Sequence, residues 1–238
     1  MRVLVVPLAV VLVLSGCSGE QAQPKKPAGG PAALADAVLQ KVRAAGTAHV
    51  EVSADGQQAT GDLCTDTATP TVRLSFIGSK PLQVVVRDGA TFVRTEGEEI
   101  EPGKPWAKLS RAGLAALGDA GKLYTGLLDV IDKALREVTI ETGLASVRNG
   151  VFDGPPAGEQ TGEQVGGVTA RRYSGTGSDP LGGAKVSWSL WVGPDGLPVR
   201  HEVRNGASSS SVLYTGWGAP VTVTPPDPGL VASLLPPN

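Results

Sequence analysis

Apolar side chains recur every four residues near the start of the folded part of the chain, and then every second residue. Leu34, Val38 and Val42 form the first pattern and Gly46 follows it, which predicts an amphipathic helix that stops at the glycine. Residues 47–54 alternate between apolar and polar side chains. This alternation predicts a strand with one buried and one solvated face.

The same alternation continues beyond the first strand. It is found in residues 58–64, 71–78, 82–89 and 90–95. Asp55-Gly56 and Asp88-Gly89 separate neighbouring segments, and both dipeptides are typical of tight hairpin turns. The first half of the chain therefore predicts an antiparallel meander and not a series of βαβ units.

Between residues 106 and 138 the spacing is that of helices. A short pattern begins after Ser110, a favourable N-cap residue, and a longer one carries Leu127, Ile131 and Leu135 on one stripe. Strand-like patterns then return in residues 164–175, 184–193, 197–206, 210–217 and 220–225. The order predicts an α+β domain, in which one curved antiparallel sheet, a half-barrel, carries helices packed on its concave face.

The N-terminus has the features of a secretory signal. Arg2 precedes an apolar run of about twelve residues, from Val3 to Leu14. This run is too short to span a bilayer, which takes about 20 residues, but it suits the core of a signal peptide. The next residues, Leu14-Ser15-Gly16-Cys17, resemble the bacterial lipobox. This resemblance implies that Cys17 receives a diacylglycerol and becomes the mature N-terminus; the alternative is an ordinary signal peptide cut near Gly16.

These features predict four segments. They are a signal peptide (1–16), a lipidated N-terminus with a flexible tether (17–31), a lipid-binding type of α+β domain (32–224) and a proline-rich C-terminal tail (225–238) that packs loosely. Lipidation of Cys17 would leave Cys64 as the odd thiol. We expect Cys64 to be partly buried and inert, and an intermolecular bridge or a reactive thiol is the alternative.

Composition and motifs exclude several classes of function. The formal net charge of −2 gives no electrostatic footprint for nucleic acid. The sequence contains no Gly-x-Ser-x-Gly elbow, no phosphate loop and no metal-spaced cysteine set. Its two histidines, His49 and His201, are expected to be surface or cross-strand residues. We therefore predict no enzyme activity, no catalytic residue, no metal site and no cofactor.

Several motifs together resemble a known family. They are the lipobox, the proline-rich tether, Trp106-Ala107-Lys108-Leu109 before the helices, and the stretch Leu190-Trp191-Val192-Gly193-Pro194-Asp195-Gly196-Leu197-Pro198. Their order is similar to that of the actinobacterial envelope lipoproteins LppX, LprA, LprF and LprG. The resemblance implies a half-barrel like those of LolA and LolB, with an apolar cavity for acylated glycolipids or other lipids.

The expected function is that of a lipid-anchored carrier on the extracytoplasmic side of the cell membrane. It would bind a lipid or glycolipid in the cavity, hold the membrane through its N-terminal anchor, and have an envelope transporter as a further candidate partner. The side chains expected to line the cavity are Val50, Val52, Leu74, Phe76, Val84, Val86, Leu127, Ile131, Leu135, Trp188 and Leu190. Core packing explains the same pattern, so the alternative is an envelope binding or assembly module with a filled core. A surface esterase is the weaker alternative.

Overall fold

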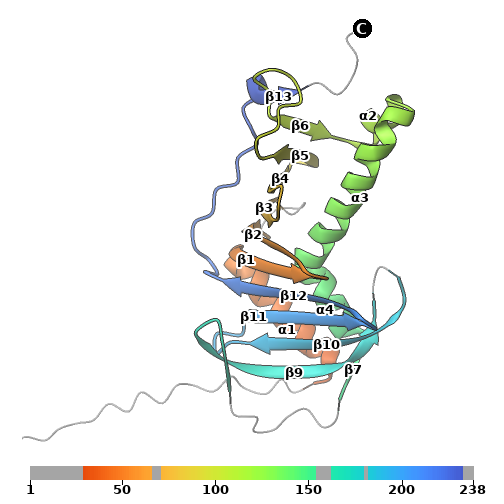
Figure 1. The fold of residues 1–238 in the computed structure, drawn as a ribbon. Helices are drawn as coiled ribbons and strands as arrows, with labels where there is room; N and C mark the ends of the chain where they lie inside the picture. Colours follow the sequence, from red (N-terminus) through yellow and green to blue (C-terminus); the bar gives the residue numbers. More distant parts are fainter. Residues whose placement is uncertain (1–28, 66–70, 154–161, 180–181, 233–238) are drawn as a thin grey trace, which may run out of the picture.

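The computed structural model describes residues 29–65, 71–153, 162–179 and 182–232 (Figure 1). The predicted signal peptide, Cys17 and most of the predicted tether lie outside these residues. Helix α1 (Pro31–Ala45) begins at a proline and is followed by Gly46, whose φ is 76°. Proline suits the first turn of a helix, because an N–H group there has no partner within the helix. Glycine suits the left-handed conformation that ends it.

The predicted meander is present. It consists of strands β1 (Thr47–Ala54), β2 (Gln57–Cys64), β3 (Thr71–Ile77), β4 (Leu82–Arg87) and β5 (Ala90–Thr95), and each pairs antiparallel with the next. Asp55 and Asp88 adopt positive φ values of 47° and 52°, and a glycine with positive φ follows each. Two consecutive positive φ values define the tight turns that match the twist of a hairpin, so the Asp-Gly prediction is confirmed at both turns.

The remaining strands extend this sheet at both ends. They are β6 (Trp106–Leu109), β7 (Val151–Phe152), β8 (Glu163–Val165), β9 (Val168–Ser178), β10 (Lys185–Val192), β11 (Pro198–Asn205), β12 (Ser208–Thr215) and β13 (Val231–Ala232). The order across the sheet is β13-β6-β5-β4-β3-β2-β1-β12-β11-β10-β9-β7, with β8 paired to β9. All pairs are antiparallel except β13 with β6. The sheet is open, which confirms the predicted α+β half-barrel.

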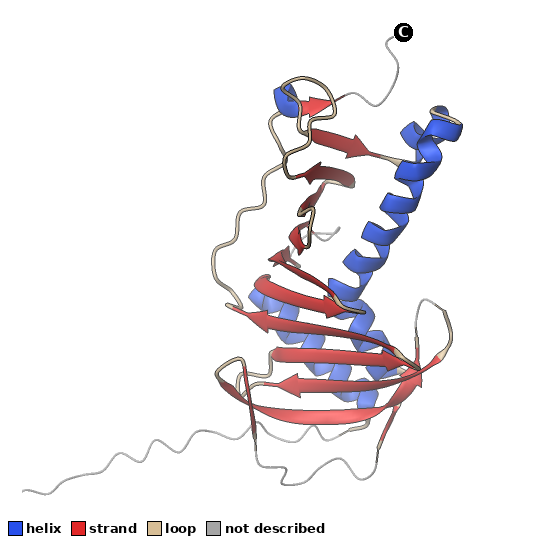
Figure 2. Ribbon diagram, viewed as in Figure 1, coloured by secondary structure: helices blue, strands red, loops and turns tan. Residues whose placement is uncertain are grey.

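Helices cover one side of the sheet (Figure 2). Besides α1 they are α2 (Arg111–Ala116), α3 (Asp119–Val138) and α4 (Ile140–Arg148). Helices α1 and α4 pack against each other beside the neighbouring strands β1, β12, β11, β10 and β9. Helix α3 leads from α4 toward α2 and β6. Ser110 caps α2 as predicted, because its hydroxyl accepts a hydrogen bond from the Gly113 N–H at 3.1 Å. None of the helices in the described part of the chain is both long and apolar enough to cross a bilayer.

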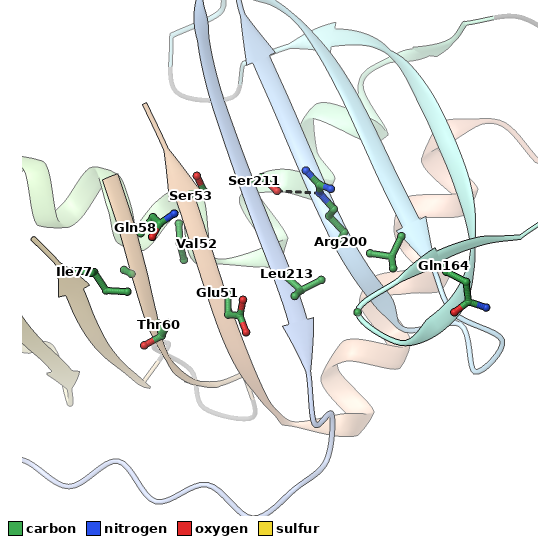
Figure 3. A pocket seen from close by; sticks show the side chains of 13 residues that line it. Glu51, Val52, Ser53, Gln58, Thr60, Ile77, Gln164, Arg200, Ser211 and Leu213 are labelled. Carbon is green, nitrogen blue, oxygen red and sulfur yellow. Dashed lines mark hydrogen bonds between the residues drawn. The ribbon is translucent and has the colours of Figure 1, made fainter. Parts of the chain in front are cut away.

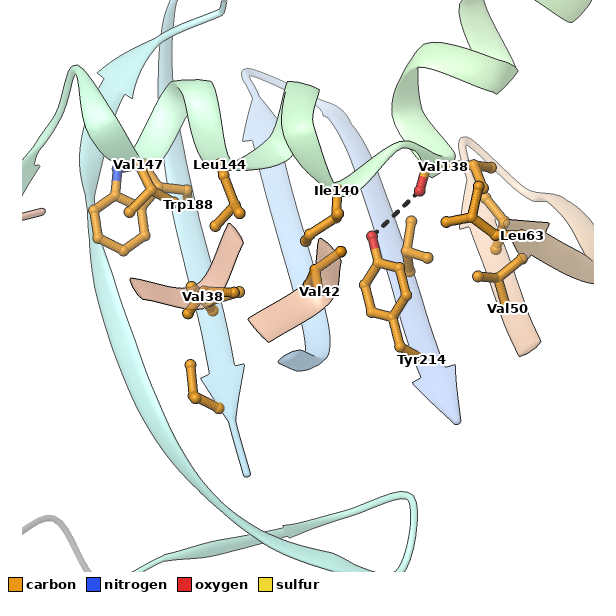
Figure 4. Close-up of a cluster of buried hydrophobic side chains, with 14 of the residues drawn as sticks. Val38, Val42, Val50, Leu63, Val138, Ile140, Leu144, Val147, Trp188 and Tyr214 are labelled. Carbon is orange, nitrogen blue, oxygen red and sulfur yellow. Dashed lines mark hydrogen bonds between the residues drawn. The ribbon is translucent and has the colours of Figure 1, made fainter. Parts of the chain in front are cut away.

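Helix α4 is absent from the sequence prediction, which ends the helical region at residue 138. Its segment contains Thr142 and Gly143, which are poor helix formers. Ile140, Leu144 and Val147 are each at most 2% exposed and belong to the main core cluster (Figure 4). The packing of this apolar face, and not helix propensity, therefore holds α4 in place.

Both faces of the sheet are partly covered. Adjacent residues of a strand point to opposite faces. Accordingly, Trp188 lies in the core beneath the helices, and Trp191 packs with Ala170 and Val199 on the outer face. Val84 and Val85 divide in the same way between an inner and an outer cluster. This arrangement explains why two strands are apolar beyond simple alternation.

The C-terminal residues 216–232, which we call the C-terminal strap, cross the outer face from β12 to the far edge of the sheet (Figure 1). Arg73 and Arg87 donate hydrogen bonds to the carbonyls of Thr222 and Val223. Residues 225–230 of the tail, which was predicted to pack loosely, are mostly exposed, and the described part of the tail ends in β13, where Ala232 is 3% exposed. Residues 233–238 of that tail lie outside the described part of the chain.

Candidate functional site

The eleven side chains expected to line a cavity fall into two clusters between the sheet and the helices. Val50, Val52, Leu74, Trp188 and Leu190 belong to the larger cluster, around α1 and α4. The second cluster lies between α3 and strands β4–β6, and includes Val84 and Ile131 with Val86 and Leu127 at its edge. Phe76 and Leu135 pack against both clusters. All eleven therefore lie between the helices and the face of the sheet that the helices cover.

Burial separates these eleven residues into two groups. Seven are buried, with at most 8% of each residue exposed: Val50, Val52, Leu74, Val84, Ile131, Trp188 and Leu190. The other four, Phe76, Val86, Leu127 and Leu135, are half-buried. In the region that these four share, on the inner side of the sheet and on the facing helix, apolar side chains stay partly accessible to solvent. This region lies between α3 and strands β3–β4.

A pocket of about 490 Å³ lies where the ends of several strands meet the helices, and we call it the strand-end pocket. Its walls come from α3, α4, the end of β1, the loop between β9 and β10, the start of β10, β11 and the start of β12. The residues that line it are Ala54, Asp55, Asp129, Lys133, Arg136, Thr142, Gly143, Ser146, Asp179, Gly182, Val186, His201, Val203, Asn205 and Ser208–Ser210. Most of these side chains are polar.

His201 is the unusual residue of the strand-end pocket. It points from β11 toward α4, is 4% exposed, and its Nε2 atom has no hydrogen-bond partner in the described structure. Burial lowers its pKa to about 4, against a smaller opposing effect of the neighbouring Glu202 carboxylate. The ring is therefore neutral at pH 7.

Of the two predicted placements, surface or cross-strand, His201 takes the second: it is buried and stands across from Leu190 and Val212 in the sheet. The burial of His201 had a signal in the strand pattern, since His201 and Val203 alternate with the charged residues Arg200, Glu202 and Arg204. The other histidine, His49, is exposed as expected, and its Nδ1 lies 3.2 Å from Asp62 Oδ1.

A second pocket, of about 510 Å³, lies on the outer face between β1, β2 and β12 and the turn that joins β8 to β9 (Figure 3). Arg200 at its wall donates to Ser211 Oγ at 3.0 Å and lies over the ring of Trp191. Trp191 in turn donates to Glu163 Oε2 at 2.7 Å. The polar groups of this network satisfy each other, so the network explains how the β8–β9 hairpin is fixed to the sheet.

A third pocket, of about 680 Å³, lies at the far edge of the sheet between α2, β6 and the C-terminal strap. Phe92, Leu114 and Val231 contribute apolar walls, and Lys108 is the charged residue among those that line it. Across the described residues, no group of three His, Cys, Asp or Glu side chains is placed to hold a metal ion.

Comparison with known proteins addresses the fold. No protein-family model and no curated protein matches the sequence. The solved structure of LprF from Mycobacterium bovis is similar, with 15% identity and a TM-score of 0.54, over 83% of this chain and 99% of the LprF chain. The lipoprotein LppX from Mycobacterium tuberculosis is similar with 14% identity and a TM-score of 0.52, over 82% of this chain and 98% of that one. The chain therefore has the fold of the LppX/LprF family, as its sequence motifs suggested.

Proposed function

We propose that the protein is a membrane-anchored envelope lipoprotein that binds lipids or glycolipids between its sheet and its helices, and carries them within the envelope. The likeness of its fold to the lipoprotein LppX supports this proposal. The observation that carries it is the set of half-buried apolar side chains on facing elements, Phe76 and Val86 from the sheet with Leu127 and Leu135 from α3. Such side chains gain free energy when an acyl chain covers them.

The mechanism would be partition. Each acyl methylene that leaves water for an apolar site contributes about 0.8 kcal/mol, so a chain of ordinary length needs no specific contact to bind. The N-terminal segment would place the protein at the membrane. Cys17 would carry the lipid anchor, and the residues after it would tether the domain to the membrane surface. An envelope transporter is the partner that such a carrier would serve.

A second function remains in competition because of a specific observation. Seven of the eleven expected lining residues are buried, most of them almost completely. A filled core of this kind suits an envelope binding or assembly module that carries nothing. The two functions differ in what happens when the half-buried side chain of Leu127 is enlarged.

The test compares two tryptophan substitutions on α3. Leu127→Trp adds volume at the packing between α3 and the sheet, whereas Val130→Trp adds it at a position that is 63% exposed. In a carrier, Leu127→Trp should lower the saturable uptake of a fluorescent fatty acid several-fold with little change in thermal unfolding, and Val130→Trp should change neither. In a filled core, the same Leu127 variant should mainly lose stability through overpacking, by about 1–3 kcal/mol.

Organic extraction of the purified protein, followed by mass spectrometry, supplies the second measurement. A carrier should release bound lipid in a reproducible ratio to protein. Absence of extracted lipid, together with failure to take up any member of a panel of fatty acids and glycolipids, would refute the carrier proposal.

A further inference from the structure

The strand-end pocket lies apart from the apolar region between α3 and the sheet. Its floor is formed by His201 and by Ser146, which are 4% and 2% exposed, and its rim by Ser208 and Asn205, which are exposed. A pocket with a deep polar floor differs from the surface of a packed core, in which buried polar groups find partners within the protein.

The imidazole of His201 is the group that indicates ligand binding in this pocket. Its Nε2 atom is buried without a hydrogen-bond partner in the described structure. Leaving such an atom unsatisfied costs free energy, and a ligand that supplies the missing bond removes this cost. Because the buried ring is neutral at pH 7, it offers one donor and one acceptor and no charge.

The charges around the pocket are largely engaged within the protein. The carboxylate of Asp129 pairs with Arg111 at 2.8 Å, and that of Asp55 accepts from the Ser209 N–H at 3.0 Å. Lys133 and Asp179 also have partners. Arg136 is exposed on α3. The groups that remain on offer are mainly uncharged hydroxyl and amide groups together with the His201 ring.

From this combination we infer that the strand-end pocket binds an uncharged group that carries several hydroxyls, such as a sugar or glycerol. A hydroxyl both donates and accepts, as do the serines and the neutral imidazole that face it. The group is either the head of a lipid or a free saccharide. The first source rests on the proposed carrier function and deepens it, because it assigns the head group to a site separate from the acyl chain.

The test uses probes with one alkyl chain and different heads. Octyl glucoside and octylphosphocholine, both below their micelle concentrations, are titrated into the purified protein by calorimetry. The glucoside should bind about five- to tenfold more tightly, which is the worth of one or two added neutral hydrogen bonds. Equal affinities for the two heads would overturn the inference.

Substitutions locate the preference. His201→Phe keeps a ring but removes both nitrogens, and it should abolish the preference for glucoside, whereas His201→Gln keeps an amide near the position of Nε2 and should retain part of it. Thermal unfolding checks that each variant folds. Ser208→Trp fills the pocket from an exposed position and should also abolish the preference, while Ser187→Trp on the outer face of β10 should not. A preference that survives both His201→Phe and Ser208→Trp contradicts the assignment.

Two further probes separate the sources and the two proposals. Binding of methyl glucoside, which has no alkyl chain, supports a free saccharide as the source, and preference seen only with octyl glucoside supports a lipid head group. A fatty acid that binds saturably while the two octyl heads remain equivalent leaves the carrier function standing and removes this inference. Binding of the sugar without any uptake of fatty acid removes the carrier function and leaves this inference standing.

Discussion

Gly143 on α4 lies directly against the ring of His201 on β11. A Cβ atom added at Gly143 would come within 2.6 Å of both Cε1 and Nδ1 of the imidazole, which is closer than real Cβ contacts allow. The helix approaches the sheet at this point because one residue lacks a side chain, and the ring of the other occupies the space. Gly143 is a poor helix former, but a larger residue at this position would clash with the buried ring of His201.

Gly143→Ala should destabilise the protein. The added methyl group must displace the ring in a packed region, which costs about 1–3 kcal/mol, while alanine returns about 1 kcal/mol through its higher helix propensity. Gly126→Ala in α3 is the matched control, because nothing lies within 4 Å of the added Cβ there. That variant should gain about 0.5–1 kcal/mol. Urea unfolding measures both, and equal effects of the two substitutions would contradict the close packing.

The free energy of unfolding should decrease as the pH is lowered, because His201 becomes protonated. Its folded pKa, about 4, lies below the ordinary value of 6.5, so the unfolded state binds more protons between these two values. The contribution of the neutral ring is thus complete above pH 6.5 and is lost as the pH falls toward 4, by about 3 kcal/mol. Carboxylates add their own slope at the acid end.

A comparison of variants isolates the histidine. The pH dependence of the free energy of unfolding should become flatter between pH 6.5 and 4 in His201→Gln. It should keep its slope in His49→Gln, because His49 is exposed. The prediction fails when the His201 variant retains the full slope.

Periodicity predicts those parts of the fold that depend on single elements. The alternation in β1 gives its inner face, and the Asp-Gly pairs at residues 55–56 and 88–89 give the hairpin turns, because both signals are local. Packing between distant segments decides what the periodicity missed. Helix α4 depends on α1, and the position of the C-terminal strap depends on Arg73 and on the outer-face cluster of Val85 and Phe92.

In the candidate site, too, local patterns predict some features and packing between distant segments decides the others. The inner positions of β1, β3, β4 and β10 follow from alternation, but the degree of burial of Leu127 or Phe76 depends on how far α3 stands from the sheet. The burial of His201 against α4 was missed because Gly143, which it contacts there, lies 58 positions earlier in the sequence. Nothing in the local pattern of either residue indicates the other.

The C-terminal strap should contribute to the stability of the whole domain. Val223 is 2% exposed and packs on Val85 and Phe92 across the outer face. Val223→Ala removes two buried methyl groups and should cost about 2 kcal/mol. Val130→Ala on the exposed side of α3 should change stability by less than about 0.5 kcal/mol. Similar unfolding midpoints for the two variants would show that the strap is not part of the cooperative unit.

The two cysteines provide a matched pair for testing the membrane anchor. When the protein is expressed in an actinobacterial host fed with labelled palmitate, Cys17→Ala should abolish incorporation of the label and release the protein from the membrane fraction. Two or more acyl chains hold a protein at a bilayer where one does not, so loss of the modified cysteine should remove the anchor entirely. Cys64→Ala, a change at a half-buried position in β2, should leave both label and location unchanged. Label that persists in the Cys17 variant, or membrane association without label in the parent protein, would refute the lipobox assignment and leave an ordinary signal peptide as the explanation of the N-terminus.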